Sequence, residues 1–390
     1  MSGDRRAFGE GELGGTESSL EACTIRQGER APDRYRVVGP DGEYDPDAVP
    51  DLTTDELRDL YGWMVVQQVV DERMVKLQRR GEMGTYASGR GQEASIVGCA
   101  APLSGEDWLF PYGREAAAML HHGMSMRDLL LYWRGVEDAN RFPDANVFPI
   151  AIAIGTHVPI GVGHAWGMLR DDADAVTAMM MGDGHPSTGE VQAGMNMAGV
   201  LGVPAVFYCQ NNGYSISQPF ANQTAANSVA QKALAWGLDG VRVDGNDVLA
   251  VYDAVRTARE RALDGTPVLV EGVTYRLDAH TTNDDPGRYR PAAEAERWEA
   301  REPLSRFEAF LKAEGHWAEI DAEARREAAH ERFDEAKAAA DAYETGGVEE
   351  LFEYVYDDLP PDLRRQAEEF AAFLAERPDA YDHIEERPKG

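Results

Sequence analysis

The fold is decided by residues 175–217, which read AVTAMMMGDGHPSTGEVQAGMNMAGVLGVPAVFYCQNNGYSIS. An apolar run over 174–181 leads directly into a Gly-Asp-Gly turn. A helical pattern over 189–202 follows, and a second apolar run over 203–210 ends before Asn211-Asn212. A strand, a helix and a strand in this order predict a parallel unit with the helix as the crossover.

Both strands of such a unit end at the same edge of the sheet, so Asp183 and Asn212 are expected to meet there. One carboxylate, one amide oxygen and nearby carbonyls suit Mg²⁺ or Ca²⁺, with phosphate oxygens completing the shell. Gly182 and Gly184 allow the backbone to approach a ligand closely. Each stretch alone could be a simple turn, but together at matching strand ends they favour a metal–diphosphate site.

Helical and strand patterns alternate outward from this unit, which predicts an α/β fold with a mostly parallel central sheet. A capping box of Thr53 and Glu56 starts a first helix, and a second box of Ser187 and Glu190 is expected to start the helix at 189–202. Further helices are expected at about 224–236, 247–264 and 362–376, and further strands within 240–245 and 267–277.

The chain divides into three parts by composition. Residues 1–50 are rich in Gly, Asp, Glu and Pro without apolar periodicity and predict a loose arm. Residues 51–345 carry the α/β pattern and a charged helical region, and residues 346–390 predict a C-terminal helical extension.

Composition excludes several classes of protein. The 390 residues are 43% hydrophobic, yet they contain no long apolar run and no N-terminal segment typical of a secretory signal, so neither a membrane span nor export is expected. Three well-separated cysteines favour a reducing cytoplasm. A net charge of −31 argues against nucleic acid as a partner. With only five lysines, the acidic surface fits the cytoplasm of a halophile, although an ordinary acidic protein stays possible.

The spacing of GDG and NN resembles the thiamin diphosphate-binding motif, and the resemblance extends over about residues 55–310. It is similar there to the alpha subunit of the decarboxylating component of 2-oxo acid dehydrogenase complexes, more to the branched-chain type than to the pyruvate type. The other matching segments are GQEA (91–94), RVDGND (242–247), EGVTYR (271–276) and AHTTNDD (279–285). The resemblance implies a three-layer α/β/α thiamin diphosphate-binding fold with N- and C-terminal helical extensions.

The resemblance also implies a set of cofactor ligands. Asp183, Asn212 and the main-chain oxygen of Tyr214 would hold Mg²⁺. Gly184, with its neighbour Gly182, would contact the diphosphate through the backbone.

Four further residues match positions at the cofactor or the substrate. Arg114 occupies the place of a phosphate-binding arginine, although a lone loop arginine is commonly a surface charge. Ile154 would pack against the cofactor with Ile152 beside it, whereas composition alone would make Ile154 a core residue. His280 would be the active-site histidine near the substrate, although a histidine after a strand is often structural.

The chain departs from the family pattern at the substrate end. Gln210 stands where an arginine is usual, Gly113 stands where a tyrosine is usual, and Ile152-Ala153 replaces a Ser-Pro pair. The oxo acid therefore stays open, with pyruvate and acetoin as alternatives to branched-chain substrates.

The resemblance implies half of an active site. Thiamin diphosphate would serve decarboxylation of a 2-oxo acid, the acyl group would pass to a lipoyl arm, and the activating glutamate would come from a beta subunit. The expected assembly is an α₂β₂ heterotetramer on a lipoyl acyltransferase core. Other possibilities are a non-catalytic interaction subunit of the same fold and a dinucleotide-binding protein, the latter disfavoured because no G-x-G-x-x-G follows a strand.

Overall fold

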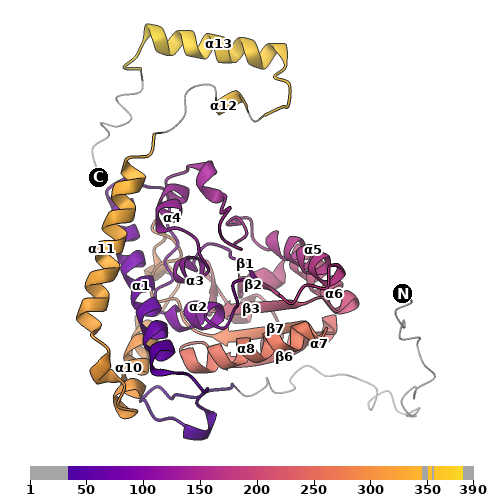
Figure 1. Ribbon diagram of the computed structural model, residues 1–390, viewed down its shortest axis with the longest axis vertical. Coiled ribbons are helices and arrows are strands. Elements are labelled where there is room, and N and C mark those ends of the chain that lie inside the picture. The colour runs from indigo at the N-terminus through magenta and orange to yellow at the C-terminus, as the bar shows by residue number, and fades with distance from the viewer. Residues whose placement is uncertain (1–33, 345–349, 354, 381–390) are drawn as a thin grey trace, which may run out of the picture.

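A parallel sheet of five strands forms the centre of the computed structural model, which describes residues 34–344, 350–353 and 355–380 (Figure 1). The strand order is β1-β2-β3-β7-β6, and every neighbouring pair is parallel. The strands span β1 Trp108–Phe110, β2 Thr177–Gly182, β3 Ala205–Asn211, β6 Asp239–Asp244 and β7 Val268–Val273. The predicted α/β class with a mostly parallel sheet is confirmed.

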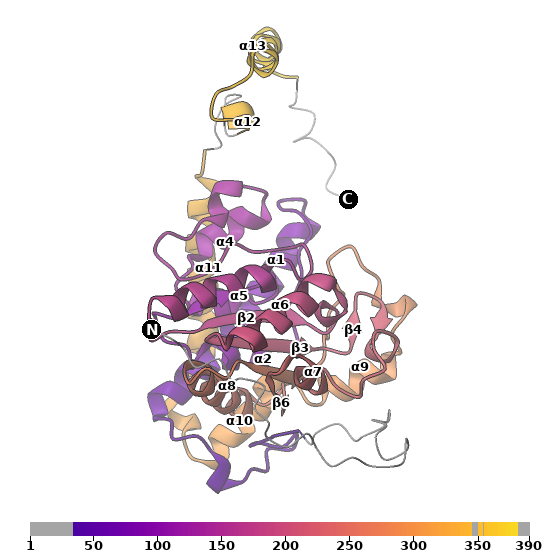
Figure 2. The same cartoon turned by 90° about the vertical axis from the view of Figure 1, so that its right-hand side faces the viewer.

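Helices cover both faces of the sheet because its strands are apolar on both sides. Along β2, Met179 packs on one face with α5 (His157–Arg170), α6 (Gly189–Leu201) and α7 (Ala233–Trp236), which include the helices nearest the viewer in Figure 2. Met180 packs on the other face. The helices that share this second core are α1 Thr54–Arg79, α2 Glu93–Ala100, α3 Ala116–His121, α4 Met126–Trp133, α8 Val248–Leu263, α10 Pro303–Ala313 and α11 Ala322–Asp341. Three layers result.

Of the two capping boxes that the sequence predicts, one starts a helix and the other does not. The capping box before α1 is confirmed, because the Thr53 main-chain N–H donates to the Glu56 carboxylate at 2.7 Å and the Thr53 hydroxyl accepts from the Glu56 N–H at 3.3 Å. The second box is wrong: residues His185–Ser187 form a 3₁₀ turn, and Thr188 caps α6.

The helix expected at about 224–236 is also wrong in its extent. Only a 3₁₀ turn at Ala230–Lys232 and the short α7 form there. The hydroxyls of Thr224 and Ser228 accept from main-chain N–H groups two and three residues later, which favours a turn over a helix.

The N-terminal segment differs from the expected loose arm over its described part. Residues 1–33 lie outside the described residues, but Tyr35 forms a parallel bridge with Val243 of β6. Val37 and Val38 are buried, and both of their N–H groups donate to the Asp247 carboxylate at 2.7 Å. Residues 34–38 therefore belong to the packed body.

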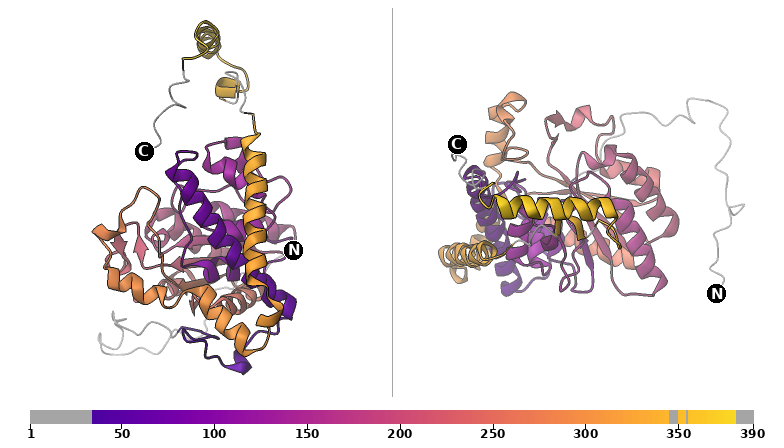
Figure 3. Two further views of the ribbon diagram at one scale, coloured as in Figure 1. Left: turned by 90° about the vertical axis from the view of Figure 1, so that its left-hand side faces the viewer. Right: turned by 90° about the horizontal axis from the view of Figure 1, so that it is seen from above.

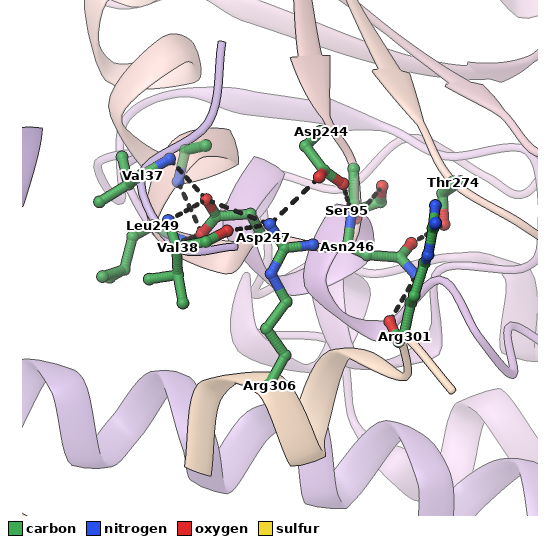
Figure 4. Close-up of polar contacts among 12 residues, drawn as sticks. Val37, Val38, Ser95, Asp244, Asn246, Asp247, Leu249, Thr274, Arg301 and Arg306 are labelled. Atoms are coloured by element: carbon green, nitrogen blue, oxygen red, sulfur yellow. Dashed lines mark hydrogen bonds and ion pairs between the residues drawn. The ribbon is translucent and has the colours of Figure 1, made fainter. Parts of the chain in front are cut away.

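A buried cluster of Asp244, Asp247 and Arg306, called the Arg306 joint below, connects this segment with β6, α8 and α10 (Figure 4). Asp247 caps α8 through the N–H groups of its first turn, and its carboxylate lies 3.7 Å from the Arg306 guanidinium of α10. The same guanidinium lies 3.1 Å from the carboxylate of Asp244 at the end of β6 and donates to the Val38 carbonyl. Arg306 is 3% exposed, so one buried cation lies between two carboxylates.

Helices dominate the chain after β7. They include α9 Ala292–Glu299, α12 Glu350–Glu353 and α13 Pro361–Glu376, whereas the two short strands β4 Tyr214–Ser215 and β5 Gln218–Pro219 lie between β3 and β6. Helix α13 stands away from the rest of the protein and has no buried residue (Figure 3). Among the helices that the structure describes, none is both long and apolar enough to cross a membrane.

Candidate active site

Asp183 and Asn212 meet at the carboxyl edge of the sheet. They follow β2 and β3, which are paired up to Gly182 and Gln210, and the Asn212 main-chain N–H faces the Asp183 carboxylate. Both residues are 3% exposed. The predicted proximity is therefore present, and the predicted role as a cation site is chemically possible there.

The carboxylate of Asp183 is buried beside a neutral partner. The Gln223 side-chain amide donates to its Oδ2 at 2.7 Å. Burial raises the pKa of Asp183 to about 6, and the hydrogen bond from Gln223 opposes that rise. The group is still mostly ionised at neutral pH, so it can offer oxygen to a hard cation.

Asn212 and Tyr214 are held in one turn. The Asn212 amide oxygen accepts from the Tyr214 N–H at 3.2 Å, and its amide nitrogen donates to Gln92 Oε1 at 3.0 Å. The Tyr214 carbonyl oxygen faces Arg276 Nη1 at 3.5 Å. Gln92 is fully buried and its amide nitrogen has no partner among the described residues, so it can still donate to a ligand.

The two glycines of the Gly-Asp-Gly turn have different neighbours. A Cβ on Gly182 would meet Tyr112 Oη at 3.5 Å, an ordinary contact. A Cβ on Gly184 would lie 2.3 Å from Ser215 Oγ and 3.0 Å from Ser215 Cβ. Since the φ of Gly184 is −74°, close approach to β4 rather than backbone conformation requires glycine there.

Gly184→Ala is expected to displace β4, and with it Tyr214, because the added methyl overlaps Ser215. Overpacking of this kind destabilises proteins by about 1–3 kcal/mol. The thermal unfolding midpoint should fall, and Gly184→Ala/Ser215→Gly should restore it because that change removes the overlapping atoms. Gly105→Ala is the matched control, since no atom lies within 4 Å of its Cβ position. A wild-type midpoint in Gly184→Ala would contradict the close contact.

Arg114 and His280 lie together, and the surface alternative for Arg114 is wrong. Arg114 is 4% exposed, and its Nη1 donates to the Ser88 carbonyl at 2.7 Å. Its Nη2 lies 2.7 Å from the His280 carbonyl oxygen and 2.8 Å from His280 Nδ1. The side chain is thus fixed from two sides.

Arg276, which the sequence analysis does not include among the site residues, connects His280 with the turn that carries Tyr214. It is 1% exposed, and its Nη1 lies 3.1 Å from His280 Nδ1 and within reach of the Tyr214 carbonyl. Within the described ranges, neither Arg276 nor Arg114 has a carboxylate partner within 4.0 Å. Two buried guanidinium groups that make no ion pair with a carboxylate favour an anion such as a diphosphate. The EGVTYR segment ends in Arg276, but nothing in its spacing marks a charge that turns inward.

Ile152 and Ile154 are exposed, by 59% and 51%. The core alternative for Ile154 is therefore wrong. The Ile152 Cδ1 lies 3.6 Å from the Cβ position of Gly113, which directly precedes Arg114. Gly113 has a φ of 121°, so a tyrosine would be strained at this position in the present backbone.

Gln210 is a buried hydrogen-bond donor instead of a cation. Its amide nitrogen donates to Glu115 Oε1 at 2.9 Å. The other oxygen of Glu115 accepts from the main-chain N–H groups of Tyr112 and Gly113, which fixes the loop before Arg114. Across the described part of the chain, no three His, Cys, Asp or Glu side chains gather as a metal centre, so a cation here would need mixed oxygen ligands.

Comparison with known proteins adds relatives of defined activity. Residues 61–349 match the family described as dehydrogenase E1 component. The chain is 42% identical to the 3-methyl-2-oxobutanoate dehydrogenase subunit alpha of Mycobacterium tuberculosis, over 87% of this chain and 94% of that protein. It is 38% identical to a pyruvate dehydrogenase E1 component subunit alpha of Staphylococcus epidermidis, over 85% and 91%. It is 39% identical to a pyruvate dehydrogenase E1 component subunit alpha of Staphylococcus aureus, over 83% of this chain and 88% of that protein.

Proposed function

The chain belongs to the dehydrogenase E1 component family, and from this premise we propose that it is the alpha subunit of a branched-chain-type 2-oxo acid dehydrogenase. The observation that carries the proposal is the convergence of Asp183, Asn212 and two buried arginines that make no ion pair with a carboxylate at one edge of the sheet. The proposed substrate class follows the relative from Mycobacterium tuberculosis, which is a 3-methyl-2-oxobutanoate dehydrogenase subunit alpha.

The family implies thiamin diphosphate, and the residues present fit this cofactor. Arg114 would bind the diphosphate with the backbone of Gly182 and Gly184, and the exposed side chains of Ile152 and Ile154 offer apolar surface. The bound cofactor would supply stabilisation of the carbanion formed when CO₂ leaves.

Three oxygen atoms at this edge of the sheet would hold Mg²⁺. Asp183, Asn212 Oδ1 and the Tyr214 carbonyl are the proposed ligands, which would require Asn212 and Tyr214 to exchange their present hydrogen bonds for the cation. Oxygen donors of this kind suit Mg²⁺, which also retains water and phosphate oxygens. His280 would face the 2-oxo acid.

A beta subunit would complete the site. Among the described residues after β7 the structure has helices and no strand, so this part forms no second α/β unit that could supply the carboxylate that activates the cofactor. We therefore propose an α₂β₂ heterotetramer that passes its acyl group to a lipoyl acyltransferase core. The charge of −31 supports a salt-rich cytoplasm as its location.

Co-expression with the candidate beta subunit tests the function. In high salt, with thiamin diphosphate, Mg²⁺ and an artificial electron acceptor, the heterotetramer should turn over branched-chain 2-oxo acids faster than pyruvate. The isolated alpha chain should show no turnover, because it lacks the activating carboxylate. Decarboxylation of a 2-oxo acid by the pure alpha chain would contradict the proposal that the active site is shared with a beta subunit.

The relatives from Staphylococcus support pyruvate as the second candidate substrate, and the same panel decides between them. Preference for pyruvate or acetoin would reassign the substrate. A cofactor-loaded heterotetramer that turns over no oxo acid would favour the non-catalytic alternative.

A further inference from the structure

We propose that the groove between α1 and α11 binds the phosphate group of a hydroxyl-rich phosphate ester, such as a sugar phosphate, through Arg325 and Arg332. The two helices lie side by side (Figure 3). None of the residues that line this groove belongs to the candidate active site, so the proposal is independent of the proposed function.

Two adjoining cavities form the groove, with volumes of about 210 and 390 Å³. They share Arg325 and Ala328, so one continues into the other. Small residues keep the first cavity open, because Ala328 and Ala329 of α11 line it together with Gly62 of α1. The groove therefore offers room for a small molecule rather than for an ion alone.

Helical spacing brings both arginines to the same face of α11. Arg325 and Arg332 are two helical turns apart, and both line the first cavity. Arg325 extends across α1, since a Cβ on Gly62 would lie 2.7 Å from its Nη1. The Arg332 Cζ lies 5.2 Å from the ring centroid of Trp63. Because Gly62 and Trp63 are consecutive, the two guanidinium groups lie beside the same turn of α1.

Both guanidinium groups lack an ion pair with a carboxylate. Within the described ranges, no carboxylate oxygen lies within 4.0 Å of Arg325 or Arg332, although Asp59 lines the same cavity. Partial burial lowers the pKa of Arg332, and no opposing charge offsets this effect. The neighbouring Arg326, by contrast, lies 3.9 Å from the carboxylate of Glu72. Two forked donors that converge without an ion pair suit the oxygens of a phosphate.

The second cavity has a different character. It is lined by Arg58, whose guanidinium pairs with Asp55 at 2.8 Å and with Glu319 at 3.2 Å. Glu319 and Asp321 line it as well and supply carboxylate oxygens. Such oxygens accept hydrogen bonds from hydroxyl groups and repel a second phosphate. A neutral part rich in hydroxyl groups therefore fits beside the phosphate better than a further charged group.

Fluorine NMR of the full chain labelled with 5-fluorotryptophan tests binding in the groove without any need for turnover. The signal of Trp63, assigned by its loss in Trp63→Phe, should shift on titration with ribose 5-phosphate at constant ionic strength. We expect a Kd of about 1 mM or lower. Inorganic phosphate should bind several-fold more weakly, because it cannot reach the second cavity.

Three results of this titration would overturn the proposal. The first is an unchanged Trp63 signal, which would show that the groove binds no phosphate ester. The second is equal affinity for ribose 5-phosphate and inorganic phosphate, which would remove the ester from the second cavity. The third is an equal shift with sulfate at the same concentration, which would indicate an adventitious ion only.

Charge variants test the two arginines. Arg325→Gln and Arg332→Gln should each weaken ribose 5-phosphate binding by about tenfold or more, because a hydrogen bond to a charged group contributes at least this factor. Lys76→Gln is the control: it removes a positive charge from α1, but Lys76 is exposed and pairs with Glu72 of the same helix at 2.5 Å. Undiminished binding in both arginine variants would refute their role.

Gly62→Ala tests the position of Arg325 without changing any charge. The added methyl should displace the end of this flexible side chain and weaken binding by about tenfold, as in Arg325→Gln. The thermal unfolding midpoint should not fall, since alanine favours a helix more than glycine does. Gly167→Ala in α5 is the matched control, because no atom lies within 4 Å of its Cβ position. Wild-type affinity in Gly62→Ala would contradict the placement of the phosphate at Arg325.

Discussion

Asp183→Ala is expected to lower the affinity of the heterotetramer for thiamin diphosphate in the presence of Mg²⁺ by at least about 100-fold, because even outer-shell partners of a metal contribute 10–100-fold. A methyl group cannot replace a hard oxygen ligand. Isothermal titration calorimetry of the cofactor, with and without Mg²⁺, measures the change. In the variant, the affinity for thiamin diphosphate should no longer depend on Mg²⁺.

Two further variants separate the ligand from the fold. Asp183→Asn keeps an oxygen that can accept from Gln223, so the turn should survive while the charge at the cation is lost. Asp171→Ala removes an exposed carboxylate that precedes β2, far from the carboxyl edge, and should bind the cofactor normally. Wild-type affinity and Mg²⁺ dependence in Asp183→Ala would remove Asp183 from the site.

Asp247→Ala is expected to lower the free energy of unfolding by about 3–5 kcal/mol, as for other buried ion pairs that lose one partner. The substitution removes the cap of α8, the acceptor for the N–H groups of Val37 and Val38, and one of the two carboxylates beside Arg306. The urea midpoint of the full chain, followed by circular dichroism, reports this change.

Limited trypsin digestion adds a local readout for the same variant. Cleavage after Arg36 should become fast in Asp247→Ala, because the adjoining main chain loses both of its carboxylate bonds. Glu260→Ala is the control on the same helix: its carboxylate pairs with Arg256 at 2.8 Å but is 60% exposed, so little stability depends on it. Equal urea midpoints of unfolding for Asp247→Ala and Glu260→Ala would show that the Arg306 joint contributes no more to stability than a surface ion pair.

Local sequence patterns were sufficient for the central layers. Hydrophobic periodicity and apolar runs predict β2, α6 and β3 to within a few residues. Because parallel strands of one unit end at the same edge of the sheet, they also predict that Asp183 lies beside Asn212. The family resemblance added Arg114 and His280, which lie in contact.

Long-range polar contacts were beyond those patterns. Arg276 turns inward because it has partners at Ile216 and Tyr289, and Gln92 and Gln223 belong to the site through contacts 120 and 40 positions away. The segment at 34–38 looks loose because it has no apolar periodicity, whereas its main chain is held by Asp247. No periodicity encodes a main-chain partner 210 positions away.

The Arg306 joint also dictates an order of events during translation. Val38 precedes its arginine partner by 268 positions, so the joint cannot close until α10 has left the ribosome. At about 5–20 residues per second, roughly 13–54 s pass between the synthesis of Val38 and that of Arg306. The first described part of the chain is thus fastened only after α10 has been synthesised.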